Sequence, residues 1–391
     1  MSFKVPFGDV KLRYESLRAQ LEESVQRVLP SGYYILGPEL ERFESRFANF
    51  LGADYAVGCA SGTDAIYMAL KAAGVGLNDE VVVVAHTAVP TISAISMTGA
   101  EPVFVDIDPS TYVMDVSKVE AALSPKTKAI VPVHLYGQVV DLDPLLELGR
   151  RTNIPVIEDV AQATGATYKG RTAGTMGDFG AFSFYPSKNL GAFGDGGAVC
   201  TNSEAGMRSL MMLRNYGQSK RYYHDTIGIN SRLDELQAAI LDAQLPFVAE
   251  WNARRREIAR RFTAGLKDVV MTPVESSFGT HVYHLYVIQT DNRDGLQQYL
   301  LDKGIQTLIH YPVPAHLQKA YAYRGYKRGD LPVTEQVTQR ILSLPMFPEL
   351  TNDQVDLVID EVAKYHSLNP QHVLQHSPNV AAPLTAASPV Q

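Results

Sequence analysis

The chain has 391 residues, of which 46% are hydrophobic and 20% charged, an ordinary globular composition long enough for two domains. Its 35 basic and 42 acidic residues give a formal net charge of −7, which argues against nucleic-acid binding as the main function. The N-terminus has no signal-peptide pattern, no apolar stretch could span a bilayer, and the cysteines Cys59 and Cys200 lie in apolar surroundings. We therefore expect a cytoplasmic protein with neither a nucleic-acid nor a membrane partner.

The first predicted element is a helix over residues 14–29, which ends at Pro30-Ser31-Gly32. From residue 55, short apolar runs alternate with helix-like segments such as 64–73 and 143–152. The runs that we interpret as strands are residues 55–57, 80–84, 102–105, 129–133, 155–157, 179–184 and 198–201. Continuous apolar runs that alternate with helices indicate a large, mostly parallel α/β sheet of seven strands, covered on both faces.

Two further helices are predicted at 234–244 and 248–266, and we expect the second to bridge two lobes. The smaller lobe contains an antiparallel-looking strand, a helix, a loop rich in Pro, His and Tyr, and a terminal helix. Their ranges are 282–289, 293–303, 304–318 and about 352–366. We predict a large domain with an N-terminal helical arm, a smaller α+β domain and a loose tail, over residues 1–250, 251–366 and 367–391 respectively.

Three predicted strands carry polar residues at an end, where ligands bind in open α/β sheets. Residues 59–64, which include Gly62 and Thr63, lead into a helix over 65–73, and the free N–H groups at a helix start suit a phosphate, although a plain helix cap by Ser61 or Thr63 is the alternative. Glu158 and Asp159 would point to opposite faces, so that one can face a site, with a helix-capping aspartate as the alternative. Lys188 lies in a glycine-rich loop between two apolar runs, where a solvated lysine is the usual alternative.

Together, a phosphate cradle, an acid and a lysine match the needs of one cofactor, pyridoxal phosphate (PLP). The lysine would form a Schiff base with the aldehyde, and the acid would keep the pyridinium nitrogen protonated. No G-x-G-x-x-G turn follows an earlier strand, so a dinucleotide is a poorer fit. No metal is expected, because there is no H-E-x-x-H motif and His310 and His316 lie in a proline-broken loop.

Several segments resemble the DegT/StrS family of nucleotide-sugar aminotransferases. They are ASGTDAIYMALKAAG, IEDVAQATGATYKG, GDFGAFSFYPSKNLGAFGDGGAV and NYGQSKRYYHDTIGINSRLDELQAAIL, and the resemblance covers about residues 5–366. It implies the fold type I (aspartate-aminotransferase) architecture and a homodimer with active sites at the subunit interface. It also implies transfer of an amino group from L-glutamate to a keto sugar nucleotide.

The resemblance implies that Lys188 is the Schiff-base lysine, that Asp159 pairs with the ring nitrogen and that Gln162 lies near the ring hydroxyl. The residues that it assigns to the cofactor phosphate are Gly62, Thr63, Ser183 and, from the other subunit, Asn230. One position departs from the family pattern, because Ala88 stands where an aromatic residue commonly stacks on the ring. The His86 ring is a candidate replacement, and a histidine satisfied at a strand end is the alternative.

The loop over residues 304–318 resembles the IHYP-x-P-x-H-x-Q segment of family members that aminate C3 of dTDP-linked keto-deoxysugars. The resemblance implies substrate contacts from His310, Tyr311 and His316, and Tyr185, three residues before Lys188, is a further candidate. A structural role for this loop is the alternative. We therefore expect amination at C3 of a dTDP-3-keto-6-deoxyhexose, to make an amino-deoxysugar for glycan, O-antigen or natural-product glycosylation.

Three other functions remain open at this point. The first is 4-amination of a dTDP-, UDP- or GDP-4-keto sugar, which the sequence does not separate from amination at C3. The second is a regulator that binds PLP or a sugar nucleotide without turnover, and the absence of a DNA-binding segment and the acidic charge weigh against it. The third is a PLP-dependent sugar dehydratase, which Lys188 disfavours because that branch has histidine there.

Overall fold

The computed structural model describes residues 3–372, so residues 373–391, most of the predicted tail, lie outside the described part. Four strands form one sheet in the order β1 (Tyr55–Cys59), β9 (Gly197–Thr201), β8 (Phe179–Ser183), β5 (Ile157–Asp159). Three strands form another in the order β3 (Glu101–Val105), β2 (Glu80–Val84), β4 (Thr127–Val131). The seven expected strands are confirmed, each within two residues of its predicted bounds.

The two sheets meet where β4 runs beside β5, through isolated parallel bridges from Ile130 to Val156 and from Val133 to Asp159. Strand β9 is antiparallel to both β1 and β8, whereas the other paired strands are parallel. Residues 81–84 of β2 are at most 1% exposed. Because successive strand residues point to opposite faces, this burial shows that both faces of the sheet are covered.

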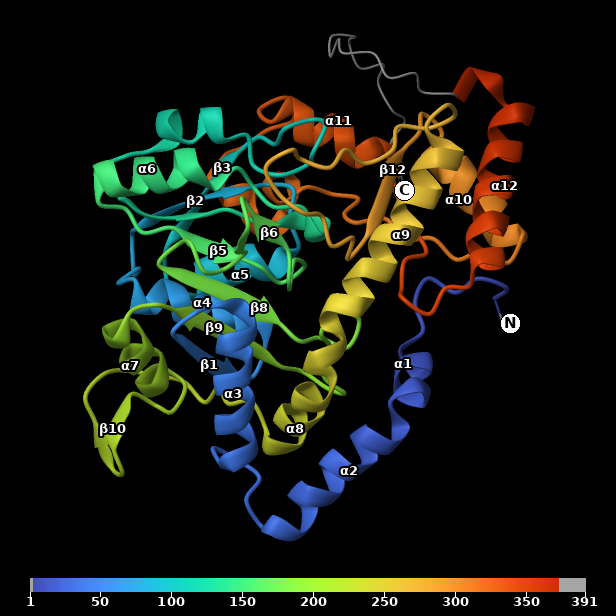
Figure 1. Cartoon of the computed structure of the whole chain (residues 1–391). Coiled ribbons are helices and arrows are strands. Elements are labelled where there is room, and N and C mark those ends of the chain that lie inside the picture. Colours follow the sequence, from blue (N-terminus) through green and yellow to red (C-terminus); the bar gives the residue numbers. More distant parts are fainter. Residues whose placement is uncertain (1–2, 373–391) are drawn as a thin grey trace.

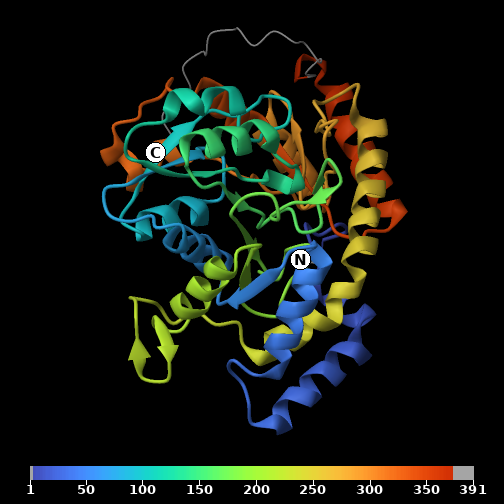
Figure 2. The ribbon, with the colours of Figure 1, turned by 60° about the vertical axis from the view of Figure 1, so that its left-hand side comes forward.

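Helices surround these sheets (Figure 1), with α4 packed on β8 and β9, α3 on β1 and α5 on β3. Their bounds are α3 (Pro38–Leu51), α4 (Gly62–Ala72), α5 (Val89–Met97), α6 (Leu142–Thr152), α7 (Glu204–Leu213) and α8 (Glu235–Gln244). Two short hairpins complete this region, β6 (Thr167–Tyr168) with β7 (Arg171–Thr172), and β10 (Gln218–Lys220) with β11 (Tyr223–His224). The hairpin of β10 and β11 projects from the body (Figure 2).

A second hydrophobic core lies in the C-terminal part of the chain. Its elements are the antiparallel pair β12 (Tyr286–Gln289) and β13 (Ile341–Leu344) with α10 (Arg293–Asp302) and α12 (Asn352–Leu368). Helix α9 (Val248–Leu266) buries Val248 and Trp251 in the larger core and Phe262 and Leu266 in the second. Figure 1 shows it crossing between the two regions, so the predicted bridging helix is confirmed.

The predicted strand over residues 282–289 is wrong in its first half, because β12 begins at Tyr286. The N–H of Val282 instead donates to the carbonyl of Gly137 at 3.0 Å. The next residue, Tyr283, has a positive φ of 44°, which a strand does not accommodate.

The predicted N-terminal helix is two helices, α1 (Val10–Ser16) and α2 (Arg18–Val28), interrupted at Leu17. Sequence reading also missed helices α3, α5, α7 and α11 (Pro332–Arg340). Residues 367–372 of the expected tail are described, and they contain the end of α12 and a 3₁₀ turn, Pro370–His372.

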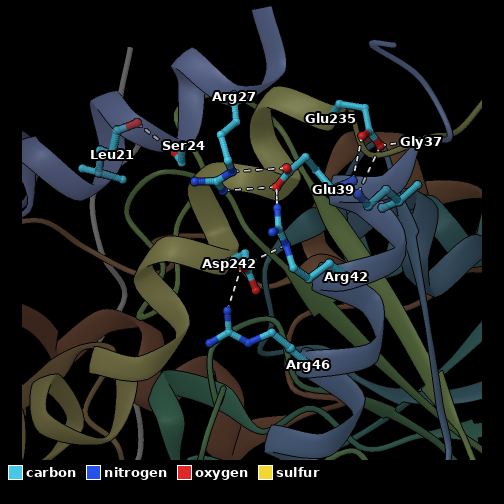
Figure 3. A network of polar contacts seen from close by, with 10 residues as sticks. Leu21, Ser24, Arg27, Gly37, Glu39, Arg42, Arg46, Glu235 and Asp242 are labelled. Atoms are coloured by element: carbon cyan, nitrogen blue, oxygen red, sulfur yellow. Dashed lines mark hydrogen bonds and ion pairs between the residues drawn. The ribbon is translucent and has the colours of Figure 1, made fainter. Parts of the chain in front are cut away.

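An ion-pair network attaches α2 and α3 to α8 (Figure 3). Arg27 of α2 donates to Glu39 of α3 at 3.2 Å, and Arg46 of α3 donates to Asp242 of α8 at 2.8 Å. Arg42 lies between these pairs and contacts both carboxylates. Because Asp242 is 5% exposed, its charge is stabilised mainly by these two guanidinium groups.

Glu235, at the start of α8, caps the N-terminus of α3 from across the chain (Figure 3). Its carboxylate accepts hydrogen bonds from the N–H groups of Gly37 at 2.8 Å, Glu39 at 2.9 Å and Leu40 at 3.1 Å. The first N–H groups of a helix have no partner within it, and a carboxylate also suits the positive end of the helix dipole.

Candidate functional site

A cavity of about 220 Å³ opens where β1, β2, β5 and β8 end. This is the sheet edge at which the sequence predicts a ligand. The lining residues are Ser61, Gly62, Thr63, Ile66, Thr87, Ala88, Pro90, Thr91, Val133, Asp159, Ala161, Gln162, Ser183, Tyr185, Lys188, Asp195 and Gly196. The structure thus brings together the three strand ends that the sequence analysis singled out.

Helix α4 begins at this cavity. The hydroxyl of Ser61 accepts from the N–H of Asp64 at 3.1 Å, which leaves the N–H groups of Gly62 and Thr63 without an acceptor in the helix. A Cβ on Gly62 would lie 2.6 Å from Cβ of Ser183, so only glycine allows α4 to start this close to β8. Free N–H groups at a helix N-terminus are suited to bind a phosphate.

Asp159 is 3% exposed and occupies the end of β5. Its Oδ2 accepts from the hydroxyl of Thr91 at 2.7 Å, and its Oδ1 accepts from the N–H of Ala161 at 3.0 Å. Burial raises the pKa of this carboxyl, while the two hydrogen bonds and the charge of Lys188 oppose the increase. A buried carboxylate facing a cavity is a suitable partner for a cation placed there.

Glu158 points away from the cavity, as the alternation of the strand predicts. Its carboxylate accepts hydrogen bonds from His134 at 2.9 Å and from the N–H groups of Gly174, Met176 and Gly177 at 2.7–2.9 Å. Burial alone would raise the pKa of Glu158, but these donors hold it below its usual value. Glu158 therefore stabilises the fold beneath the site and leaves Asp159 as the acid that faces the cavity.

Lys188 lines the cavity and is partly buried. Its N–H donates to the carbonyl of Tyr185 at 2.8 Å, and its own carbonyl accepts from Nη1 of Arg13 at 3.1 Å. Burial lowers the pKa of the Lys188 amine to about 8, and the charge of Asp159 opposes this decrease. An amine with this pKa is partly neutral near pH 7 and can act as a nucleophile or a base.

Gln162 connects the cavity to the predicted substrate loop. Its Oε1 accepts from the N–H of Tyr136 at 2.7 Å, and its Nε2 donates to the hydroxyl of Tyr311 at 3.0 Å. Burial raises the pKa of Tyr311 to about 12, so this hydroxyl stays protonated at neutral pH. Tyr185, 56% exposed, also lines the cavity.

His86 lies at the end of β2, but Thr87 and Ala88, not His86, line the cavity. The Nε2 of His86 is 2.7 Å from the hydroxyl of Tyr136, and burial lowers its pKa to about 4. The ring of His86 meets that of Tyr136 edge-on at 5.8 Å. Its Nδ1 is buried without a hydrogen-bond partner among the described residues, so the ring is only half satisfied, and stacking of His86 on a cofactor ring stays a prediction.

The predicted substrate histidines have different surroundings. His310 has its Nδ1 2.9 Å from the hydroxyl of Ser343, and its ring stacks on Phe7 at 5.6 Å. His316 is 1% exposed, with its Nε2 3.1 Å from a carboxylate oxygen of Glu335. The ring of His316 is therefore enclosed, whereas Tyr311 touches the cavity residue Gln162.

Asn230 is exposed and lines a recess that adjoins the cavity. Asp195 belongs to the lining of both. The sequence analysis did not predict three residues that make polar contacts at the site. Thr91 contacts Asp159, Thr87 contacts Thr91, and Arg13 contacts the carbonyl of Lys188. A threonine pair just after an apolar strand was the available signal for Thr87 and Thr91, but nothing local marks Arg13.

Within residues 3–372 no three His, Cys, Asp or Glu side chains are grouped so that they could hold a metal ion. In the same part of the chain no helix combines the length and the apolar character needed to cross a membrane.

Comparisons with known proteins agree with this site. The model of the DegT/DnrJ/EryC1/StrS aminotransferase family matches residues 15–363. The dTDP-3-amino-3,4,6-trideoxy-alpha-D-glucose transaminase of Streptomyces venezuelae is 46% identical over 93% of this chain and 96% of that protein. A pleiotropic regulatory protein of Geobacillus stearothermophilus is 43% identical over 93% of this chain and 98% of that protein.

Solved structures are similar along nearly the whole chain. Streptomyces venezuelae DesV in complex with a ketimine intermediate has a TM-score of 0.91 and 46% identity, covering 93% of this chain and 99% of that one. NtdA from Bacillus subtilis with bound cofactor PMP has a TM-score of 0.86 and 32% identity, covering 93% and 85%. The family match, the identities and the shared fold agree with the lysine and aspartate that face one cavity, and the chain belongs to the DegT/DnrJ/EryC1/StrS aminotransferase family.

Proposed function

We propose that this protein is a PLP-dependent aminotransferase that moves an amino group from L-glutamate to C3 of a dTDP-3-keto-6-deoxyhexose. The product would be an amino-deoxysugar used in glycan, O-antigen or natural-product glycosylation. The observation that carries the proposal is the meeting of Lys188, Asp159 and the N-terminus of α4 in one cavity. The names of the Streptomyces transaminase and of the PMP-bound NtdA support it.

The residues present fit the cofactor. The glycine at the start of α4 lets the free N–H groups of that helix lie close to the end of β8, where a Cβ would clash with Ser183. Within residues 3–372, Asp159 is a buried carboxylate whose hydrogen-bond donors are a hydroxyl and a backbone N–H, neither of them cationic. When bound, PLP supplies an electron sink that stabilises negative charge at the carbon that exchanges its amino group. Its ring nitrogen would pair with Asp159, and its phosphate would lie at Gly62, Thr63 and Ser183.

Lys188 would hold the cofactor covalently and then move protons at its Nζ once it is displaced by the amino donor. The lowered pKa of Lys188, about 8, leaves a neutral fraction at pH 7 that can accept a proton. Gln162 would lie beside the cofactor ring and hold Tyr311, and we propose that Tyr185, His310 and Tyr311 contact the sugar. His316 would act through its pairing with Glu335, as a support for that loop.

A direct test offers the purified enzyme 3-keto and 4-keto dTDP sugars side by side with L-glutamate, and locates the new amine by NMR. Nitrogen on C3 supports the proposal. Nitrogen on C4 would show a 4-aminotransferase and would leave the PLP site intact. Binding without turnover of any keto sugar nucleotide would favour a regulator, a role that the name of the Geobacillus relative also suggests.

We further propose a homodimer in which Asn230 of one subunit reaches the phosphate site of the other. Asn230 is exposed beside the cavity, and large apolar side chains near it are exposed in the single chain. The nearby β10–β11 region exposes Tyr222 by 78%, Tyr223 by 63% and Ile227 by 92%. Burial of such side chains against a second copy is a strong driving force for association.

We also propose three further features, which concern the sheet, the domain boundary and the cellular location. We infer that the four- and three-stranded sheets act as one seven-stranded sheet, because two bridges and three backbone hydrogen bonds connect residues 130–134, at and after the end of β4, to residues 155–159, which include β5. We place the domain boundary near residues 250–251, in α9, because that helix enters both hydrophobic cores. We expect a cytoplasmic enzyme, since both cysteines are buried and unpaired.

A further inference from the structure

We propose that Thr91, backed by Thr87, is a positioning residue that orients the Asp159 carboxylate and keeps it ionised for the cofactor ring nitrogen. This inference rests on the proposed function. Neither threonine belongs to the residues that the sequence analysis assigned to the site. Thr91 lies in the first turn of α5 and is 1% exposed, and Thr87 precedes that helix and is 4% exposed.

The geometry sets the direction of the hydrogen bonds. The Thr91 hydroxyl donates to Oδ2 of Asp159 at 2.7 Å, and its oxygen lies 3.1 Å from that of Thr87. A hydroxyl has one proton, so when Thr91 donates to Asp159, the Thr87 hydroxyl must donate to Thr91. The two hydroxyls form a relay that ends on a carboxylate oxygen, and an ionised carboxylate is an acceptor only.

The second carboxylate oxygen is also held. Oδ1 of Asp159 accepts from the N–H of Ala161 at 3.0 Å. With one donor on each oxygen, the plane of the carboxyl group is defined before any cofactor binds. Each oxygen keeps a further lone pair, which a protonated ring nitrogen in the cavity can use. Preorganisation of this kind lowers the ordering cost of binding.

The hydrogen bond from Thr91 also opposes the effect of burial. Burial raises the pKa of Asp159, and the Thr91 hydrogen bond, the Ala161 N–H and the charges of Lys188 and His134 lower it. Tyr311 is the other titratable group that senses Asp159, and it is neutral at pH 7 because its pKa is about 12. Removing the Thr91 donor should therefore make Asp159 bind a proton at higher pH.

The test compares Thr91→Val, which keeps the volume and removes the donor, with Thr91→Ser, which keeps the donor. The matched control is Thr98→Val, because Thr98 caps the C-terminal end of the same helix, is 8% exposed and donates to the carbonyl of Ile95 at 2.7 Å. The dissociation constant of PLP is measured by fluorescence from pH 5 to pH 9. The free energy of unfolding of the cofactor-free protein is measured over the same range.

For Thr91→Val we expect PLP affinity at pH 7 to fall, because more of Asp159 is protonated and its carboxyl plane is no longer fixed. The upper limit is about 150-fold, the full value of a hydrogen bond to a charged group, since the bond is also present in the cofactor-free protein. The acid limb of the affinity profile should move to higher pH. In the cofactor-free protein, the stability difference from wild type should shrink on acidification, because protonated Asp159 no longer needs the donor. Thr91→Ser should restore both profiles, and Thr98→Val should lose stability equally at every pH.

The inference is overturned if Thr91→Val binds PLP with the wild-type affinity and pH profile, or if Thr98→Val shifts that profile in the same way. Should Thr91→Val fail to fold, Thr91→Ala and Thr87→Val replace it, and a wild-type profile in both overturns the inference equally. Failure of the wild-type protein itself to bind PLP would refute the proposed function instead, so the two failures are distinguishable.

Discussion

Replacement of Gly62 by alanine tests the phosphate cradle most directly. A Cβ at this position would lie 2.6 Å from Cβ, 2.9 Å from Oγ and 3.2 Å from Cα of Ser183. Carbon atoms in contact prefer about 3.5–4.0 Å. Rotation of the Ser183 side chain can move only Oγ, so the start of α4 or the end of β8 must shift. That shift displaces the N–H groups proposed to hold the phosphate.

The expected size of the effect follows from this overlap. Overpacking of this kind costs about 1–3 kcal/mol of stability. Because binding requires the displaced N–H groups to return to the phosphate, the same cost opposes binding, and PLP affinity should fall by up to about 150-fold. Alanine is the better helix former by up to ~1 kcal/mol, which offsets part of the strain in the cofactor-free protein. The free energy of unfolding of that protein should therefore fall by less than the free energy of PLP binding. Gly76→Ala is the matched control, because the nearest atoms to its new Cβ lie 4.0 Å away and its φ is not positive.

The assay measures the dissociation constant of PLP by fluorescence and the Tm of each cofactor-free variant. Gly62→Ala with Ser183→Gly should be more stable than the sum of the single changes, because the two shortest contacts disappear. A folded Gly62→Ala protein that binds PLP within twofold of wild type would refute the argument that this glycine forms the cradle.

Three further predictions concern the lysine, the dimer and the buried acid. Borohydride reduction and peptide mapping should place the pyridoxyl group on Lys188, and a label on another lysine would contradict the assignment. Mixing inactive Lys188→Ala and Asn230→Ala subunits should restore some activity, whereas no recovery despite proven subunit exchange would place Asn230 in the site of its own chain. Glu158→Gln should lower the free energy of unfolding at pH 7 by about 3–5 kcal/mol. Because the folded-state pKa of Glu158 is below its usual 4.5, the stability difference between wild type and Glu158→Gln should vanish as pH falls through that lower value. A stability difference that stays constant with pH would disprove that the ionised carboxylate is the stabilising group.

The sequence predicted the sheet well because buried parallel strands are continuous apolar runs, as residues 80–84 show. It missed α5 because that helix is apolar on nearly all sides, so no amphipathic period marks it. Helix α3 does carry a local signal, a proline at its first position followed by acidic residues in the first turn. The strand over 282–289 was predicted too long because Tyr283 reverses the backbone through a left-handed conformation that no pattern encodes.

The candidate site was predictable to the extent that its residues follow strand ends. Asp159 and Lys188 do so, and the structure places both at one cavity. The contacts that orient them connect residues far apart in the chain, such as Thr91 with Asp159, 68 residues away, and Arg13 with Lys188, 175 residues away. Nothing in local periodicity pairs such residues, because each pairing exists only once the helices pack on the sheet.

The cap that Glu235 provides for α3 has a consequence for biosynthesis. The residues it joins are up to 198 positions apart, so α3 cannot obtain this partner until the nascent chain has emerged from the ribosome beyond residue 235. At about 5–20 residues per second, that delay is roughly 10–40 s. During this interval α2 and α3 lack α8, the helix against which both pack in the folded protein. Translation speed between these two points therefore sets how long these two helices stay without their native partner.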